Sequence, residues 1–202
     1  MKVLFVHGLA SSGAFRTAGA LKNLLRPCTV ISPDLPFDPD EALSLLRSIC
    51  DGEHPDLIVG HSLGGFLAQQ IRGFRKVLIN PSFHTAEFMR HRMKGKVEYL
   101  NVRQNGETSF FITDELCDRY AALELTQFDS LDDAEIARTM GLFALEDEVV
   151  KCGREFEQRF PGRSVSYHGT HLPCYRDIKE VLVPALPKFF PDFTEVLSRD
   201  RL

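Results

Sequence analysis

The stretch that decides the fold is DLIVGHSLGGFLAQQI, residues 56–71. Its apolar run ends at Gly60, and an amphipathic run begins at Leu63 with no linker between them. This pattern predicts a strand that turns sharply into a helix, with Ser62 at the apex of the turn. Gly60 and Gly64 lack the β-carbons that would collide in such a turn. The hydroxyl of Ser62 would then lie at a helix N-terminus, where backbone amides and the helix dipole favour negative charge.

Two interpretations of Ser62 follow from this position. In a Gly-x-Ser-x-Gly turn between a strand and a helix, the raised serine is typically a nucleophile. The alternative is an N-capping serine in a glycine-rich loop, which many α/β proteins have. The strand before the motif and the helix after it favour the nucleophile. A serine hydroxyl attacks only when a base takes its proton and an acid orients that base, so partners are needed elsewhere in the chain.

Short apolar runs alternate with longer segments of helical periodicity along the rest of the chain. We predict strands over residues 3–6, 28–31, 57–59, 77–79, 140–144 and 164–167, and helices over residues 14–25, 39–51, 63–73, 148–160 and 174–190. Most of these strands are continuously apolar, as expected when both faces of a sheet are covered. The sequence therefore predicts an α/β protein with a mostly parallel six-stranded sheet flanked by helices.

Residues 81–135 interrupt this alternation. The segment YLNVRQNGETSFFIT, residues 99–113, predicts a hairpin with Asn105-Gly106 at its turn. We expect an insertion after the fourth strand, within a single domain that spans residues 1–202. The insertion also carries a basic cluster, which could attract an anionic part of a substrate, such as the phosphates of an acyl-CoA, although such runs are more often a solvated helix face. Its members are Arg90, His91, Arg92, Lys94 and Lys96.

Composition narrows the class of protein. The chain has 202 residues, 44% of them hydrophobic, and a net charge of -4 with interspersed signs, which gives no reason to expect nucleic-acid or membrane binding. The apolar run at the N-terminus is too short for a signal peptide. The cysteines are five in number, scattered and without Cys-x-x-Cys spacing, which favours reduced thiols in a cytoplasmic protein.

Candidate partners for Ser62 lie late in the chain, in the order acid then base that this turn requires. Asp147 follows the strand predicted over 140–144, and His171 follows the strand predicted over 164–167. Glu146 and Glu148 compete for the role of acid, and we prefer Asp147 because Glu148 already resembles a first helical turn. His168 competes for the role of base, and we prefer His171 because it lies past Gly169 in a loop that could cross over the serine.

The first strand ends in His7-Gly8, on the same edge of the sheet. Gly8 would let the backbone turn so that the N–H of Leu9 faces Ser62, and the N–H of Leu63 would be a second oxyanion donor. The alternative is that Ser11 or Ser12 simply caps the following helix. We expect no metal site, because His168-x-x-His171 lacks the context of a zinc motif. We also expect no cofactor, since no glycine-rich phosphate loop is present.

With these residues in place, the chain resembles the α/β-hydrolase superfamily and, within it, the small YqiA/YcfP-like bacterial esterases. The resemblance covers nearly the whole chain. It rests on these segments: the strand ending in His7-Gly8, Ser11-Ser12, VISPDLP at 30–36, Gly60-x-Ser62-Leu63-Gly64-Gly65, Asn80-Pro81, EDEVV at 146–150 and GTH at 169–171. It implies a compact hydrolase fold without two leading antiparallel strands. It also implies Ser62 as nucleophile, His171 as base, Asp147 as acid, and Leu9 and Leu63 as backbone oxyanion donors.

The sequence thus predicts a serine hydrolase that cleaves a small-molecule carboxylic ester or thioester through an acyl-enzyme. A different class remains open: a non-catalytic protein of the same fold that binds a ligand or a partner. A narrower option keeps the enzyme but changes the acceptor, as in an acyltransferase or a cofactor-free haloperoxidase. The pattern does not favour any oligomeric state.

Overall fold

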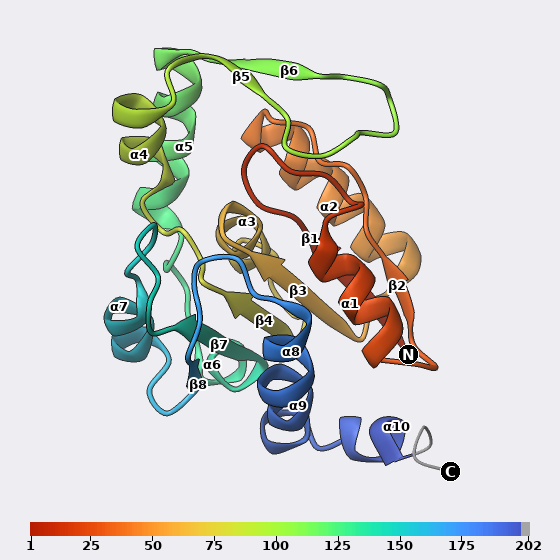
Figure 1. The fold of residues 1–202 in the computed structure, drawn as a ribbon. Coiled ribbons are helices and arrows are strands. Elements are labelled where there is room, and N and C mark those ends of the chain that lie inside the picture. Colours follow the sequence, from red (N-terminus) through yellow and green to blue (C-terminus); the bar gives the residue numbers. More distant parts are fainter. Residues whose placement is uncertain (199–202) are drawn as a thin grey trace.

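The computed structural model describes residues 1–198, so residues 199–202 of the predicted domain lie outside the described residues. Within residues 1–198, six parallel strands form one sheet in the order β2-β1-β3-β4-β7-β8 (Figure 1). The strands are β1 (Lys2–Val6), β2 (Thr29–Ile31), β3 (Leu57–His61), β4 (Lys76–Ile79), β7 (Thr139–Ala144) and β8 (Ser164–Tyr167). The six predicted strands and the predicted α/β fold class are confirmed.

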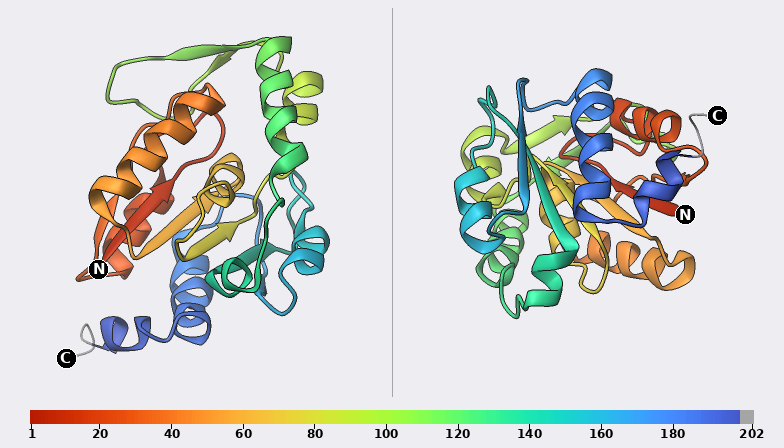
Figure 2. Two further views of the ribbon diagram at one scale, coloured as in Figure 1. Left: turned by 180° about the vertical axis from the view of Figure 1, so that it is seen from behind. Right: turned by 90° about the horizontal axis from the view of Figure 1, so that it is seen from below.

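Both faces of the sheet are buried under helices, which explains the continuous apolar runs (Figure 2). Leu4 and Val6 point to one face and pack in a core with α2, α3 and α7. Val3 and Phe5 point to the other face and pack with α1, α9 and α10. The helices are α1 (Arg16–Leu24), α2 (Pro39–Glu53), α3 (Leu63–Gln69), α7 (Gly153–Arg159), α9 (Val183–Phe189) and α10 (Phe193–Ser198).

Two predicted helices differ from the observed ones for reasons visible in their side chains. The helix predicted over 148–160 begins only at Gly153, because the Asp147 carboxylate accepts the N–H groups of Val149 and Val150 and folds these residues into a turn. The helix predicted over 174–190 is divided into α8 (Tyr175–Asp177), a π-helical turn over Ile178–Leu182 and α9. Proline in the first turn of α9 has no N–H to donate into the preceding turn.

The insertion over residues 81–135 lies above the carboxyl ends of the strands (Figure 1). It contains α4 (Thr85–Arg92), the antiparallel pair β5 (Gly95–Glu98) and β6 (Ser109–Ile112), α5 (Asp114–Thr126) and the start of α6 (Asp133–Arg138). The hairpin is real, but its paired strand is 95–98. Residues 99–102, which the sequence placed in a β-rich run, belong instead to a long loop in which Gly106 has a φ of 77°.

This loop of the insertion is anchored on the loop that follows β1. The N–H of Leu100 donates to the carbonyl of Ala10 at 2.7 Å, and the hydroxyl of Ser11 donates to Asn101 at 3.1 Å. The buried guanidinium of Arg103 donates to the carbonyl oxygens of Ser11 and Leu35. The insertion therefore forms one wall above the sheet edge. Within residues 1–198, no helix has both the length and the apolar character needed to cross a bilayer.

Candidate active site

Ser62 lies at the apex of a turn that closes without any intervening residue between β3 and α3. Its backbone has φ 56° and ψ −120°, a region that L-residues rarely adopt. The glycines permit the turn, since a β-carbon on Gly64 would lie 2.1 Å from the carbonyl oxygen of Val6, and one on Gly60 would lie 2.4 Å from that of Gly64. The Ser62 side chain makes no capping hydrogen bond to α3, so the capping interpretation does not describe this serine.

His171 and Asp147 meet Ser62 at the carboxyl edge of the sheet. The Nε2 atom of His171 lies 2.9 Å from the Oγ of Ser62, and its Nδ1 atom lies 2.8 Å from Oδ2 of Asp147. Because a carboxylate only accepts, Nδ1 carries the proton and Nε2 presents its lone pair to the serine hydroxyl. Oδ1 of Asp147 is fixed by two backbone N–H groups. Serine, imidazole and carboxylate are thus joined in one hydrogen-bonded series.

The competing residues lie elsewhere. His168 has a side chain that is 87% exposed, and its Nδ1 atom lies 2.9 Å from Glu146. Glu146 is thereby paired away from His171. The exposed ring of His168 faces Glu146, and His171 is the histidine that lies next to Ser62.

The peptide between Gly8 and Leu9 passes beside Ser62. A β-carbon on Gly8 would lie 3.2 Å from the β-carbon of Ser62, which measures how closely the two segments approach. His7 fixes this peptide, since its Nδ1 donates to the Gly8 carbonyl at 2.9 Å and its Nε2 accepts the N–H of Leu35 at 3.0 Å. Burial lowers the pKa of His7 to about 4, so the ring is neutral at pH 7 and can make both bonds.

Because the C=O and N–H of one peptide point in opposite directions, anchoring the Gly8 oxygen turns the Leu9 N–H away from His7. The N–H of Leu63 belongs to the first turn of α3, where amides have no acceptor within the helix. Leu9 and Leu63 both line the cavity that Ser62 faces, and their roles as oxyanion donors stay predictions.

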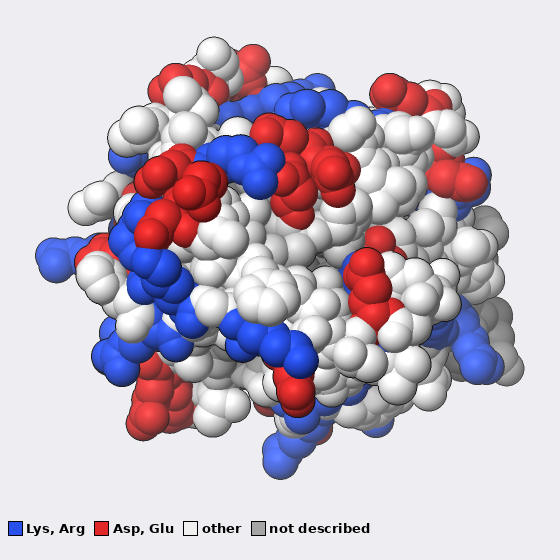
Figure 3. Space-filling model, turned by 90° about the horizontal axis from the view of Figure 1, so that it is seen from above, with Lys and Arg blue, Asp and Glu red and all other residues white. Residues whose placement is uncertain are grey.

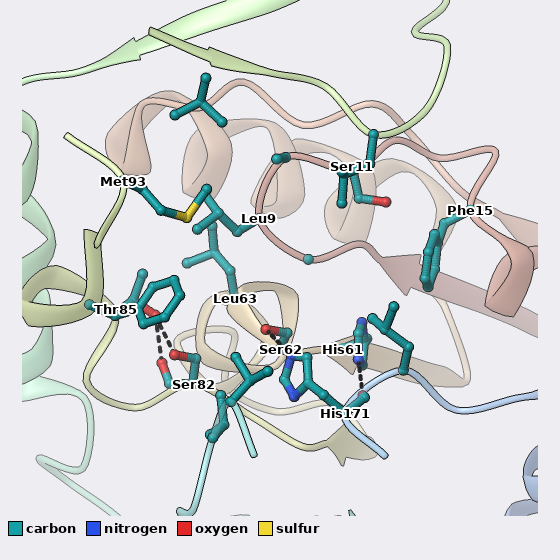
Figure 4. Close-up of a pocket in the computed structure, with 18 of the residues that line it drawn as sticks. Leu9, Ser11, Phe15, His61, Ser62, Leu63, Ser82, Thr85, Met93 and His171 are labelled. Carbon is teal, nitrogen blue, oxygen red and sulfur yellow. Dashed lines mark hydrogen bonds between the residues drawn. The ribbon is translucent and has the colours of Figure 1, made fainter. Parts of the chain in front are cut away.

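A cavity of about 460 Å³ opens above Ser62 and His171 (Figure 4). Its wall is mostly apolar and comes from the loop after β1, from the start of α3, from the insertion and from the loops after β7 and β8. Side chains that line it include Leu9, Phe15, Phe88, Met93, Leu100 and Leu172. A cavity of this size is typical of a site for a small molecule, and its apolar wall suits a hydrocarbon group.

Two members of the basic cluster, Arg90 and Lys94, are paired with acidic side chains of α5. Arg90 pairs with Asp114 and Asp118, and Lys94 pairs with Asp114 at 2.5 Å. Figure 3 shows Lys and Arg side chains interspersed with Asp and Glu on the face that carries the insertion. The paired charges favour the interpretation of a solvated helix face over that of an anion-binding site.

Sequence reasoning missed a group of three possible metal ligands near the cavity, because its members are far apart in the chain. The donor atoms of His84, Cys152 and Glu155 lie within 4.8 Å of one another. His84 and Glu155 already bind each other at 2.7 Å. Burial raises the pKa of the Cys152 thiol to about 11, which keeps it protonated at pH 7. These contacts account for the group as a hydrogen-bonded pair, His84 and Glu155, beside a buried thiol.

Comparisons with known proteins agree with this architecture. A model described as the alpha/beta hydrolase family matches residues 3–199. A monoacylglycerol lipase from Paleococcus ferrophilus is similar with a TM-score of 0.62 and 15% identity, over 98% of this chain and 94% of the lipase. A pyrethroid hydrolase from Sphingobium faniae JZ-2 is similar with a TM-score of 0.58 and 16% identity, over 94% and 96% of the two chains. At sequence identities this low, the two similar structures support the fold alone. No match was found among the curated proteins.

Proposed function

The chain belongs to the alpha/beta hydrolase family, and from this membership we propose that it is a serine hydrolase that cleaves a carboxylic ester or a thioester. The observation that carries the proposal is the unbroken series Ser62–His171–Asp147, with separations of 2.9 Å and 2.8 Å. This series supports Ser62 as the nucleophile, because His171 lies within hydrogen-bonding distance of Ser62 and is itself held by Asp147.

In the proposed reaction, the Ser62 oxygen attacks the acyl carbon while His171 takes its proton at Nε2. Asp147 holds the imidazole in the required tautomer and stabilises the imidazolium that forms. The N–H groups of Leu9 and Leu63 donate to the oxyanion of the tetrahedral intermediate. His171 then gives its proton to the departing alcohol or thiol, and a water molecule hydrolyses the acyl-enzyme by the same steps. These residues suffice for the chemistry without a cofactor.

We propose that the apolar cavity holds the hydrocarbon part of the substrate. Each methylene that enters it would contribute about 0.8 kcal/mol, or about fourfold in kcat/KM, until the cavity is filled. We further propose a single domain in which residues 81–135 act as a cap over this cavity, and a place among the YqiA/YcfP-like esterases. Buried thiols at Cys50, Cys117 and Cys152 support a cytoplasmic location.

A fluorophosphonate probe tests the nucleophile directly, because it phosphonylates activated serines. We expect wild-type protein to be labelled at Ser62 and Ser62→Ala to remain unlabelled, with mass spectrometry locating the adduct. Ser164→Ala is the matched control, since Ser164 lies at the far end of β8 and hydrogen-bonds Glu157. Folded wild-type protein without an adduct would favour the non-catalytic alternative.

Hydrolysis of para-nitrophenyl esters and acyl-CoA thioesters of graded length then separates the substrate classes. The proposal expects cleavage that depends on Ser62 and rises with chain length before it levels off. Hydrolysis that survives Ser62→Ala would place the chemistry at another residue.

A further inference from the structure

The backbone carbonyl of His171 accepts two side-chain hydrogen bonds that the reaction itself does not require. Nε2 of His61 lies 2.9 Å from this oxygen (Figure 4), and Nδ2 of Asn80 also lies 2.9 Å from it. Both donors are only 2% exposed. A carbonyl oxygen has two lone pairs, so its capacity is filled by residues from the ends of β3 and β4.

The orientation of the Asn80 amide is fixed by its other contacts. Its Oδ1 accepts the N–H of Ala144 at 2.8 Å, and a backbone N–H can only donate, so the NH₂ group is the one that faces His171. The same NH₂ group donates to the hydroxyl of Tyr167 at 3.1 Å. Asn80 thereby joins the end of β7, which leads to Asp147, to the loop after β8, which carries His171. Its φ of 43° is one that asparagine tolerates better than most residues.

His61 acts from the strand that carries the nucleophile. Burial lowers the pKa of His61 to about 4, so its ring is neutral at pH 7. The nitrogen that faces a carbonyl oxygen must carry the proton, which assigns Nε2 as the donor. The ring is stacked on Phe15, with centroids 5.8 Å apart and planes within 8°. Because Ser62 directly follows His61 in the chain, this hydrogen bond connects the backbone of His171 to the residue next to Ser62.

The segment of residues 168–174 that carries His171 has neither helix nor strand to hold it. We propose that Asn80 and His61 are positioning residues that hold the His171 backbone so that its imidazole stays within hydrogen-bonding distance of Ser62. The inference rests on the proposed function, because positioning matters to catalysis only where His171 is the base. A displacement of about 1 Å at a reacting group typically costs about 10²-fold in rate.

Asn80→Asp tests the proposal with little change in shape. The new carboxylate still accepts the N–H of Ala144, but it cannot donate a hydrogen bond to the His171 carbonyl. One carboxylate oxygen instead faces the carbonyl oxygen of His171, and the two oxygens repel each other. We expect kcat to fall about 10²-fold at pH 8 with KM nearly unchanged, since Asn80 does not line the cavity. His61→Phe removes the other donor while keeping an aromatic ring on Phe15, so it gives a second test if Asn80→Asp does not fold.

Gln127→Glu is the matched control. Gln127 is a buried amide whose Nε2 donates to the carbonyls of Phe83 and Glu124, so the same chemical change is made away from His171. We expect it to lower the midpoint of thermal unfolding but to leave kcat within about twofold. In a His171→Ala background, Asn80→Asp should slow the residual reaction no further, because its effect passes through His171.

A crystal structure of Asn80→Asp gives a readout that does not depend on activity. The proposal expects the separation of Ser62 Oγ and His171 Nε2 to exceed hydrogen-bonding distance. A wild-type kcat in Asn80→Asp, an equal loss in Gln127→Glu, or an unmoved imidazole would overturn it. Activity that survives Ser62→Ala would instead overturn the proposed function, and the separation in the crystal would still decide the role of Asn80.

Discussion

Replacing Asp147 by asparagine is expected to stop the reaction by reversing the tautomer of His171. In the structure, Oδ1 of Asp147 accepts two backbone N–H groups and Oδ2 faces Nδ1 of His171. The amide oxygen of the asparagine must take the place of Oδ1, because only an acceptor satisfies those N–H groups. Its NH₂ group then faces Nδ1 of His171, which must give up its proton to accept. The proton moves to Nε2, and the imidazole can no longer remove the proton of Ser62.

The size of the effect follows from the loss of the base in its working form. Changes of this kind in Ser-His-Asp triads cost about 10⁴-fold in kcat, which corresponds to about 5 kcal/mol of transition-state stabilisation. Stability should change little, because the amide oxygen preserves both contacts to the 149–150 backbone. Asp147→Ala should differ in this respect, since it also loses the capping oxygen and about 0.5–2 kcal/mol of stability.

Steady-state hydrolysis of para-nitrophenyl butyrate, with urea unfolding of the same samples, measures both quantities. Glu146→Gln is the matched control, since it changes the neighbouring carboxylate, which binds the exposed His168. We expect the control to keep kcat within about twofold. The reasoning is refuted if Asp147→Asn keeps kcat within tenfold of wild type, or if Glu146→Gln is equally damaging.

Three further predictions concern stability. Gly64→Ala should destabilise the fold by about 1–3 kcal/mol in urea unfolding and should slow hydrolysis, because a β-carbon at this position would lie 2.1 and 2.5 Å from backbone oxygens. Gly52→Ala in α2 is the control: a β-carbon there meets nothing within 4 Å, so the variant should be more stable by about 0.5–1 kcal/mol. Burial lowers the pKa of His7 to about 4, while the unfolded value is about 6.5, so the unfolded chain binds more protons between these values. Stability should therefore fall by about 2 kcal/mol from this residue between pH 7 and pH 5, and a pH slope that is the same in His7→Asn would contradict this. Lys76→Met should cost about 3–5 kcal/mol, because it removes the ammonium that lies 2.7 Å from the buried carboxylate of Glu135 and leaves Arg138, at 3.7 Å, as the remaining ion-pair partner among the described residues. The double variant with Glu135→Leu should recover most of the loss in the same assay.

The sequence predicted the sheet well, because a strand buried on both faces needs apolar residues at every position rather than at alternate ones. Strands such as 3–6 and 57–59 consist of consecutive apolar residues, since neighbouring side chains enter opposite cores. The turn at Ser62 was equally clear, because Gly60 and Gly64 are required by contacts between backbone atoms. The catalytic roles of Ser62, His171 and Asp147 stay predictions, although His171 lies at hydrogen-bonding distance from both Ser62 and Asp147.

Other features depend on contacts between segments that are distant in the chain. The late start of α7 follows from a single carboxylate, Asp147, which competes with the helix for two N–H groups. The true strand of the hairpin, 95–98, alternates weakly and carries charge, so residues 99–102 gave a stronger but wrong signal. The bonds of His61 and Asn80 to His171 span more than ninety residues of sequence, and no local pattern indicates them.

The backbone at Ser62 has a consequence for how this chain can change over generations. An L-residue at φ 56° and ψ −120° raises the free energy of the folded state by about 1–3 kcal/mol, and glycine would relieve most of that. In a lineage that does not need the hydroxyl, replacement of this serine by glycine would therefore be favoured, because it stabilises the fold. Descendants that keep serine at this position despite its cost in stability are therefore those that still depend on its hydroxyl oxygen.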